Sequence, residues 1–192
     1  MAKRVWKPGC VLYPVPAVMV TCGDFKNKKS MNIITIAWTG TANSEPPMVH
    51  ISVRPERYSY NIIKEYGEFV VNLATEGLVF PMDYCGVKSG RDADKFEKTG
   101  LTPIASQVVA APSIAESPVN IECETQKIIP LGTHDMFIGK IVSVSADEKY
   151  FDENGAFRFE DAAPVCYSHG NYYGLGKYIG KFGYSVEKKS VR

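Results

Sequence analysis

Runs of alternating apolar and polar residues dominate the chain and predict a protein built mainly of strands. Residues 48–54, MVHISVR, alternate with a period of two, so valine and isoleucine share one face and polar side chains share the other. The valine-rich run 17–23 and the stretch 31–38 flank the polar turn 24–30, which indicates a hairpin. Further strands are expected at 68–74, 118–131 and 134–147.

Helical patterns are shorter and fewer than strand patterns. Residues 57–67 predict an amphipathic helix that ends at Gly67, and 78–86 form a second helical patch. A short helix over 92–100 also ends at a glycine, while 39–47 is expected to be a loop. The pattern therefore predicts an antiparallel barrel, mainly β, with a few short helices.

Glycines mark two departures from regular strands. Gly139 interrupts the long strand 134–147, where a bulge or bend is expected. Residues 164–184 form a glycine- and tyrosine-rich tail. Its stretch GLGKYIG (174–180) is not a dinucleotide fingerprint, because the third glycine falls one position late and no apolar strand precedes it. We interpret it as a flexible tail segment.

Composition narrows the class of protein. The chain has 192 residues, 45% of them hydrophobic, which suits a single domain over 1–192 with a full core. The net charge is +1, from 22 basic and 21 acidic residues. A general nucleic-acid binder needs a basic face that neutralises many phosphates, so this balance argues against that class. A local basic pocket is still compatible with it.

The apolar runs and the cysteines indicate a cytoplasmic protein. No run approaches the ~20 residues needed to cross a bilayer, so no membrane association is expected. The N-terminus has the basic start and apolar stretch of a signal peptide, but Pro14 and Pro16 interrupt it and no cleavage site follows. The five cysteines form no C-x-x-C pair, which favours buried thiols in a reducing compartment.

Motifs for hydrolysis or metal binding do not occur. The chain has no G-x-x-x-x-G-K-[ST] loop, no H-E-x-x-H and no G-x-S-x-G, and its three histidines are scattered. No metal site is therefore expected. A bound organic cofactor is one way to supply the reaction chemistry.

Anion-binding groups gather where a predicted strand meets the helix that follows it. Ser52, Arg54, Arg57 and Ser59 supply hydroxyl and guanidinium groups within eight residues, beside the start of the helix. The preceding hairpin adds a polar and flat set suited to a heterocycle: Asn32, Thr35 and Trp38. Together these residues predict a phosphate site beside a flat ring. The alternative is a solvated turn with surface arginines.

Five segments in a fixed order give the chain a likeness to a known family: LYPVPAVMVT, MNIITIAWTGTANSEPPMVHISVRPERYSYNII, GEFVVNLA, CGVKSGRDADKFEKTGL and GTHDMFIGKIVSV. Over roughly residues 10–150 the chain resembles the flavin reductase-like, FMN-binding split-barrel family, and within it the flavoredoxins most. The resemblance implies a six-stranded antiparallel split barrel and a non-covalently bound FMN. It also implies a homodimer with the flavin near the subunit interface.

The resemblance assigns particular residues to the cofactor. The strand 32–38 would lie along the isoalloxazine, and the segments around Arg54 and Tyr58 would hold the phosphate and ribityl chain. Asn72 would sit beside the flavin, and His134 would line the ring-side cleft. The full set is Asn32, Thr35, Ala37, Trp38, Ser52, Arg54, Tyr58, Ser59, Tyr60, Asn72, Ser89, Lys95, Phe96 and His134.

Structural roles stay open for several of these residues. Trp38 is either a ring contact or plain core, and Phe96 either contacts the cofactor or anchors its helix. Lys95 is alternatively a solvated helix residue paired with a nearby aspartate, and His134 a loop residue bonded to backbone. Cys85 is expected to be inert rather than to approach the flavin.

Two functions compete on this basis. One is a flavin oxidoreductase that transfers electrons from NAD(P)H to flavin. The other is a flavoredoxin-like electron-transfer protein that receives electrons from a protein partner. A pyridoxamine-phosphate-oxidase-like or heme-binding relative is a third, weaker option. Hydride transfer needs no protein acid or base, so no catalytic residue is assigned.

Overall fold

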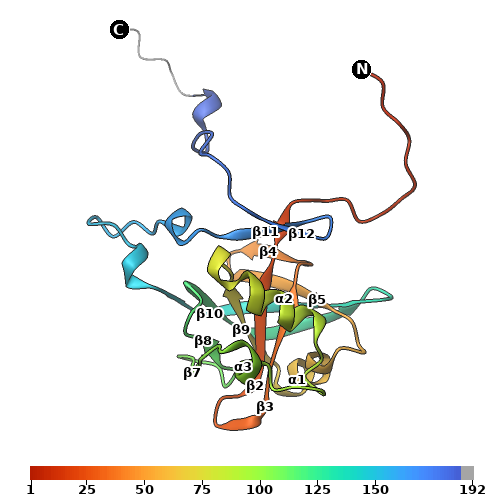
Figure 1. Ribbon diagram of the computed structural model, residues 1–192, viewed down its shortest axis with the longest axis vertical. Helices are drawn as coiled ribbons and strands as arrows, with labels where there is room; N and C mark the ends of the chain where they lie inside the picture. Colours follow the sequence, from red (N-terminus) through yellow and green to blue (C-terminus); the bar gives the residue numbers. More distant parts are fainter. Residues whose placement is uncertain (187–192) are drawn as a thin grey trace.

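Seven antiparallel strands form the body of the molecule, which a computed structural model describes over residues 1–186 (Figure 1). In spatial order they are β3 (Asn27–Ile36), β2 (Val18–Asp24), β6 (Glu68–Leu73), β9 (Val119–Pro130), β10 (Asp135–Ala146), β5 (Pro47–Val53) and β4 (Thr39–Ser44). Each neighbouring pair in this sheet is antiparallel. The mainly β, antiparallel class predicted from the alternation is therefore confirmed.

The sheet has one strand more than the six expected, because residues 39–47 are not wholly a loop. Residues 39–44 pair with β5 as strand β4, with Thr39 opposite Ile51 and Ser44 opposite Pro47. The sequence TGTANS shows no apolar alternation. It forms an edge strand that is exposed for most of its length. The segment therefore becomes a strand because it pairs with β5, and not because its own residues alternate between apolar and polar.

The inner face of the sheet carries the main core. Buried valine, isoleucine and phenylalanine side chains from the strands pack there with Ile63 of α1 (Tyr58–Tyr66). Gly139 permits a close approach inside this core, because an added Cβ would lie 2.6 Å from Cζ of Phe69. The β9–β10 ladder shifts register between Ile138 and Gly139, which confirms the predicted bulge.

Two helices lie against the other face of β2 and β3: α2 (Val79–Val87) and α3 (Lys95–Thr99). A second apolar cluster fills this layer and includes Met19, Ile33 and Phe96. Gly67 and Gly100 end α1 and α3 in the left-handed region, as the sequence predicts. In the described part of the chain, no helix is long and apolar enough to cross a membrane.

Part of the tyrosine-rich tail is ordered into a small sheet. β11 (Val165–Ser168) pairs with β12 (Asn171–Gly174) and with β1 (Val15–Pro16), which joins the tail to a segment near the start of the chain. Residues 175–181, within the stretch interpreted as a flexible tail segment, form no helix or strand. The remaining short elements are β7 (Pro103–Ile104), β8 (Ser113–Ile114), η1 (Glu76–Leu78), η2 (Glu148–Tyr150), η3 (Phe159–Ala162) and η4 (Tyr184–Val186).

A buried polar network crosses the sheet at Asn72 of β6. Its amide nitrogen donates to the Met19 carbonyl at 3.0 Å and to the Thr21 hydroxyl at 3.1 Å. Its amide oxygen accepts from the Ile114 backbone N–H at 3.0 Å and from the Asn120 side chain at 2.8 Å. The Asn72 side chain is fully buried and serves to tie β6 to its neighbours.

We predict that Asn72→Ala lowers the free energy of unfolding by about 2–4 kcal/mol, because several buried donors and acceptors lose their partner at once. Urea denaturation followed by circular dichroism measures this loss. Asn61→Ala, at an exposed position of α1, is the matched control and should change the same quantity by less than about 0.5 kcal/mol. Equal effects of the two substitutions would show that the network does not hold the sheet.

Candidate functional site

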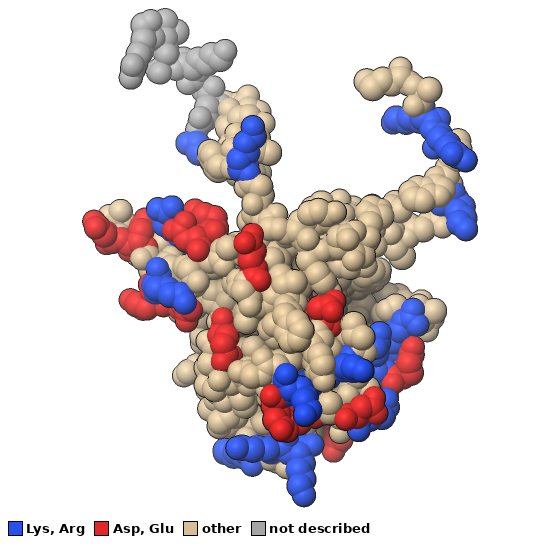
Figure 2. Space-filling view, viewed as in Figure 1, with Lys and Arg blue, Asp and Glu red and all other residues tan. Residues whose placement is uncertain are grey.

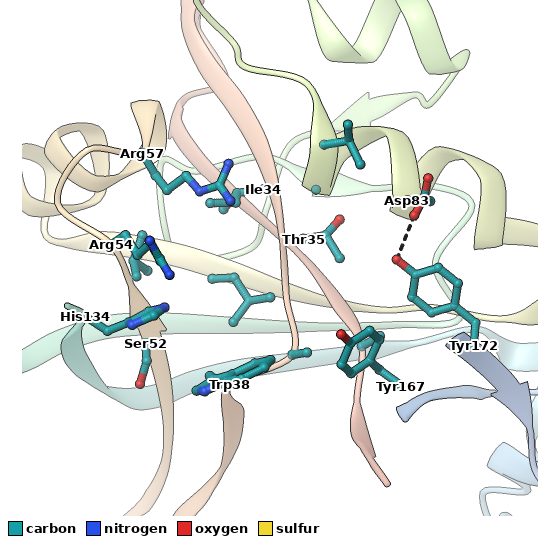
Figure 3. A pocket seen from close by; sticks show the side chains of 16 residues that line it. Ile34, Thr35, Trp38, Ser52, Arg54, Arg57, Asp83, His134, Tyr167 and Tyr172 are labelled. Carbon is teal, nitrogen blue, oxygen red and sulfur yellow. Dashed lines mark hydrogen bonds between the residues drawn. The ribbon is translucent and has the colours of Figure 1, made fainter. Parts of the chain in front are cut away.

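A cleft of ≈ 380 Å³ opens between β3, β5, α2 and the small tail sheet (Figure 3). The backbone of residues 34–38 runs along it, and the rings of Trp38, His134, Tyr167 and Tyr172 line it. We call this hollow the aromatic cleft. Its combination of flat rings and strand backbone suits a flat, partly polar ligand.

A second hollow of ≈ 270 Å³ adjoins the aromatic cleft, and the two share Ile34, Arg54, Arg57 and Gly86 as lining residues. We call it the cationic pocket. Five cationic side chains line it: Arg54, Arg57, Lys88, Arg91 and Lys95. Glu56 is the one carboxylate among its lining residues. The two hollows therefore offer a ring site and an anion site side by side.

Two tyrosines close the aromatic cleft on the side of the tail sheet. The Tyr172 hydroxyl donates to Oδ1 of Asp83 at 2.9 Å, the contact drawn in Figure 3. Burial, followed by this bond to Asp83, raises the pKa of Tyr172 to about 12. The Tyr167 ring lies 5.9 Å from that of Tyr172 and 6.3 Å from that of Trp38, measured between centroids. Together these rings form a wall.

Trp38 and His134 face the cleft rather than the core. The Trp38 side chain is 41% exposed, so the alternative that it is plain core is wrong. The His134 ring nitrogen Nδ1 lies 3.0 Å from the Thr133 hydroxyl. Partial burial, and then the nearby Arg54 charge, lower the pKa of His134, which favours a neutral imidazole at neutral pH.

A tight contact between α2 and β3 fixes the floor of the cleft. The Thr35 hydroxyl donates to the Met82 carbonyl of α2. An added Cβ on Gly86 would lie 3.2 Å from Cβ of Thr35, so a side chain there would crowd the strand. Gly86 therefore lets the end of α2 lie directly on β3.

The start of α1 opens into the cationic pocket. Arg57 precedes the helix, and no side chain caps its first N–H groups. The Tyr60 N–H donates to the Arg57 carbonyl at 3.0 Å, while no side chain accepts from the Tyr58 and Ser59 N–H groups before it. Helix N-termini bind anions readily. Arg54 pairs with Glu56 at 3.4 Å, whereas no carboxylate of residues 1–186 lies within ion-pair distance of Arg57. Figure 3 shows both guanidinium groups beside the cleft.

Gly90 lets the loop after α2 lie on the other wall of this pocket. An added Cβ on Gly90 would lie 2.3 Å from Oδ1 of Asn32 and 2.6 Å from the Tyr58 ring. The Asn32 amide nitrogen donates to the Ser59 hydroxyl at 2.7 Å, which links β3 to α1 beneath the loop. Ser89 lines the pocket from the same loop. A residue larger than glycine at position 90 would therefore lift the loop.

Lys95 lies at the bottom of the cationic pocket and is almost fully buried. Its ammonium donates to the carbonyls of Ile33 and Cys85, both at 2.7 Å. The alternative of a solvated lysine paired with an aspartate is therefore wrong. Burial lowers the pKa of Lys95, and the two carbonyls supply the hydrogen bonds that a buried ammonium needs.

Most of the residues assigned from the resemblance are brought together by the fold. Those that line the aromatic cleft or the cationic pocket are Asn32, Thr35, Ala37, Trp38, Ser52, Arg54, Tyr58, Ser59, Ser89, Lys95 and His134. Three residues line neither hollow. Asn72 belongs to the buried network, and Phe96 anchors α3 in the second apolar cluster. Tyr60 packs on Phe137 and donates its hydroxyl to Asp135 at 2.5 Å.

Several lining residues were not assigned in advance. Gly86 and Gly90 could have been found from the sequence, because a glycine near a turn often marks a place where the backbone comes close to another segment. Arg91 follows Gly90 directly, and its guanidinium lies 5.4 Å from the Tyr58 ring centroid. Tyr167 and Tyr172 carry no local signal, because only the pairing of β1 with β11 places them at the cleft.

The chain is similar in sequence to several known proteins. The model of the flavin reductase like domain family matches residues 10–176. A protein of Archaeoglobus fulgidus is 33% identical over 141 residues, 73% of this chain and 77% of its own. The NADH:FMN oxidoreductase of Rhodococcus qingshengii is 27% identical over 143 residues, 72% of this chain and 67% of its own.

The fold is likewise similar to a solved structure. Flavoredoxin of Desulfovibrio vulgaris (Miyazaki F) superimposes with a TM-score of 0.88 at 31% identity, covering 97% of this chain and 100% of that chain. This likeness confirms the split-barrel class and the similarity to flavoredoxins that the sequence indicates.

We predict that Cys22, Cys85 and Cys123 resist thiol reagents in the native protein. Burial is the main cause that raises the pKa of Cys22 and Cys123 to about 12 and that of Cys85 to about 11, so few thiolates form. Iodoacetamide labelling at pH 8 followed by mass spectrometry measures this. The exposed Cys10 is the internal control and should be modified first. Native labelling of Cys85 at a rate like that of Cys10 would contradict the described packing of α2.

Proposed function

Because the chain belongs to the flavin reductase-like family, we propose that it is an FMN-dependent oxidoreductase whose flavin spans the aromatic cleft and the cationic pocket. The observation that carries this proposal is the continuity of the two hollows. A flat, apolar-walled site and an anion site share four lining residues, as a ligand with a ring at one end and a phosphate at the other requires.

The phosphate end would be held by groups from β5 and α1. Arg57 has no carboxylate partner among residues 1–186, and the uncapped first turn of α1 lies beside it. A guanidinium and backbone N–H groups are the donors that phosphate oxygens accept best. Ser59 and Arg54 also line the pocket, although Arg54 already forms an ion pair with Glu56.

The ring end would be held by β3 and the residues after it. Ile34 offers an apolar side chain, and the backbone from Thr35 to Trp38 offers N–H and C=O groups along the cleft. The Trp38 indole and the Tyr167 ring give flat surfaces that exclude water from one side. When bound, FMN would supply the two-electron redox chemistry, as the acceptor of a hydride from a dihydronicotinamide. These residues bind and orient and need not transfer a proton.

An electron-transfer protein is the second candidate. The likeness to flavoredoxin of Desulfovibrio vulgaris favours a protein as electron donor, whereas the likeness to the NADH:FMN oxidoreductase of Rhodococcus qingshengii favours a nicotinamide. Both candidates require the same flavin site. We place the protein in the cytoplasm in either case, because all five of its cysteines are free thiols.

We further propose that the chain forms a homodimer. Residues 1–12 form an N-terminal arm that extends away from the body and leaves Trp6 73% and Leu12 87% exposed. Figure 2 shows several basic side chains along this arm. The tail on the same side leaves Ile179 85% exposed. Large apolar side chains without cover are typical of an interface. The aromatic cleft borders this region through Tyr167, which would place the flavin near the partner.

We predict that the purified protein shows the flavin absorption bands in the blue and in the near-ultraviolet, and that acid releases FMN. Chromatography of the released flavin identifies it. The compact cationic pocket supports a single terminal phosphate rather than an adenosine extension. Release of stoichiometric FAD, or a pyridoxal spectrum in place of a flavin spectrum, would contradict the proposed function.

We predict that Arg57→Ala weakens FMN binding roughly tenfold to a hundredfold, because a hydrogen bond to a charged group contributes about 1.5–3 kcal/mol. Riboflavin, which lacks the phosphate, should lose less than about threefold. Quenching of flavin fluorescence measures both dissociation constants. Arg158→Ala removes an exposed arginine paired with Asp161 and is the matched control. Equal losses for FMN and riboflavin would mean that Arg57 supports folding rather than the phosphate.

We predict that light scattering gives twice the monomer mass for the FMN-loaded protein. A monomer that keeps its FMN would rule out a flavin site that depends on the partner subunit.

A further inference from the structure

Residues 147–162 project from the body at the left edge of Figure 1 and form what we call the acidic lobe. Its sequence, DEKYFDENGAFRFEDA, holds six carboxylates, two basic residues and four aromatic rings. Both basic residues already pair with an aspartate inside the lobe, each at 3.1 Å. Glu148 and Glu153, by contrast, have no cation within ion-pair distance among residues 1–186. The lobe therefore keeps a surplus of negative charge.

An aromatic face of the same lobe is open to solvent. The Phe151 and Phe157 rings lie 5.1 Å apart, and Phe159 stacks on Phe157 at 6.0 Å between centroids. Phe151 and Phe157 are both exposed. The backbone holds them in place, because the two residues pair as a β-bridge and the Asp152 carboxylate accepts from two N–H groups of the turn between them. A fixed group of exposed aromatic rings is typical of a docking surface.

The N-terminal arm has the opposite charge and an aromatic ring of its own. It carries no carboxylate and three cations, which are Lys3, Arg4 and Lys7. Trp6 stands among these cations, and every residue of the arm is exposed. The arm and the acidic lobe thus combine opposite charges with uncovered aromatic side chains, so their surfaces are complementary.

We propose that the arm of one copy of this chain lies on the acidic lobe of a second copy. Trp6 would pack on the phenylalanine rings, and Lys3 and Lys7 would lie beside Glu148 and Glu153. The proposal rests on the proposed homodimer and deepens it, because it states which segments of the two subunits meet. It concerns binding alone and assigns no chemical step to either segment.

Charge and apolar contact would contribute differently to this pairing. An exposed ion pair contributes little free energy by itself, whereas complementary charges select the partner and fix its position. Burial of the Trp6 indole against the phenylalanine rings supplies the larger part, since aromatic side chains dominate the energetics of protein interfaces. Arg4 can add a cation–π contact with the same rings.

The fold keeps the arm and the lobe of one chain apart. The arm leads into β1 and the lobe leads into β11, and these two strands are antiparallel, with Val15 opposite Tyr167. The arm therefore meets the tail sheet at the opposite end from the lobe. Figure 1 shows the two segments on opposite sides of the body. The partner of each segment is thus a segment of another molecule.

A second copy supplies both complementary surfaces from one sequence. In a dimer with two-fold symmetry, the arm of each subunit would lie on the lobe of the other, which gives two identical contacts. An unrelated protein would cover only one of the two segments. Both segments also lead directly into the sheet that carries Tyr167, so the pairing would brace this wall of the aromatic cleft from the partner subunit.

The test measures the dimer dissociation constant of the FMN-loaded full chain by analytical ultracentrifugation. The arm variant is Lys3→Glu with Lys7→Glu, and the lobe variant is Glu148→Lys with Glu153→Lys. All four positions are exposed, so the variants should fold. Each variant should raise the dissociation constant roughly tenfold to a hundredfold, because attraction becomes repulsion at two contacts. Both sets of substitutions in one chain restore opposite charges and should bring the constant back to within about threefold of the wild type.

The matched control is Lys28→Glu with Lys29→Glu, at exposed positions of β3. It changes the net charge by the same amount as the arm variant and should leave the dissociation constant within about threefold of the wild type. Combined with the lobe variant, it restores the net charge of the chain but not the charges of the arm–lobe contact. This combination should therefore not rescue dimerisation.

A second readout locates the contact. A carbodiimide joins an amine to a carboxylate without a spacer, so it should link Lys3 or Lys7 to Glu148 or Glu153. Mass spectrometry of the digested gel bands should find these links in the band of twice the monomer mass and not in the band of monomer mass. Higher salt concentration should reduce them, because exposed charges are screened.

Three results would overturn the proposal. One is a dimer whose dissociation constant responds to neither the arm variant nor the lobe variant, which leaves the homodimer standing on another interface. Another is rescue of the lobe variant by the control pair as well as by the arm pair, which would assign the effect to net charge. The third is arm–lobe links in the band of monomer mass, which would place the arm on the lobe of its own chain. A monomeric wild-type protein is detected beforehand by light scattering and would defeat the proposed homodimer itself.

Discussion

The buried ammonium of Lys95 is the interaction on which the candidate site depends. It joins the Ile33 carbonyl of β3 to the Cys85 carbonyl of α2 at 2.7 Å each, in a position almost closed to water. A buried charge is costly, and two well-placed carbonyls offset that cost only if strand and helix keep their positions. The hydrogen bond from Thr35 to Met82 ties the same two elements one turn earlier. The wall of both hollows is therefore set by a polar contact and not by apolar packing alone.

The same constraint explains how a nearly neutral chain presents a strong anion site. The whole sequence has a net charge of +1, and Figure 2 shows acidic and basic side chains next to one another in the lower part and at the left edge of the viewed face. Around Lys95, however, the end of α2, the loop at Gly90 and the start of α1 converge, and each brings arginine or lysine with it. Local geometry, rather than composition, concentrates the charge.

Local sequence pattern predicted those parts of the fold and site that depend on neighbours along the chain. The alternation of β5, the glycine ends of α1 and α3 and the bulge at Gly139 are of this kind. Strand β4 was missed because its polar sequence pairs only as an edge, and the tail sheet because Val15 pairs with Tyr167 across most of the chain. Asn72 and Phe96 were assigned to the cofactor by resemblance, but their side chains are committed to a buried network and a core cluster.

We propose that one ligand occupies the aromatic cleft and the cationic pocket together. A crystal structure of the protein with FMN tests it most directly. We expect the isoalloxazine to lie along residues 34–38 and the phosphate within hydrogen-bond distance of Arg57 and the first turn of α1. A flavin phosphate that points away from the cationic pocket, or a ring that lies outside the aromatic cleft, would contradict it.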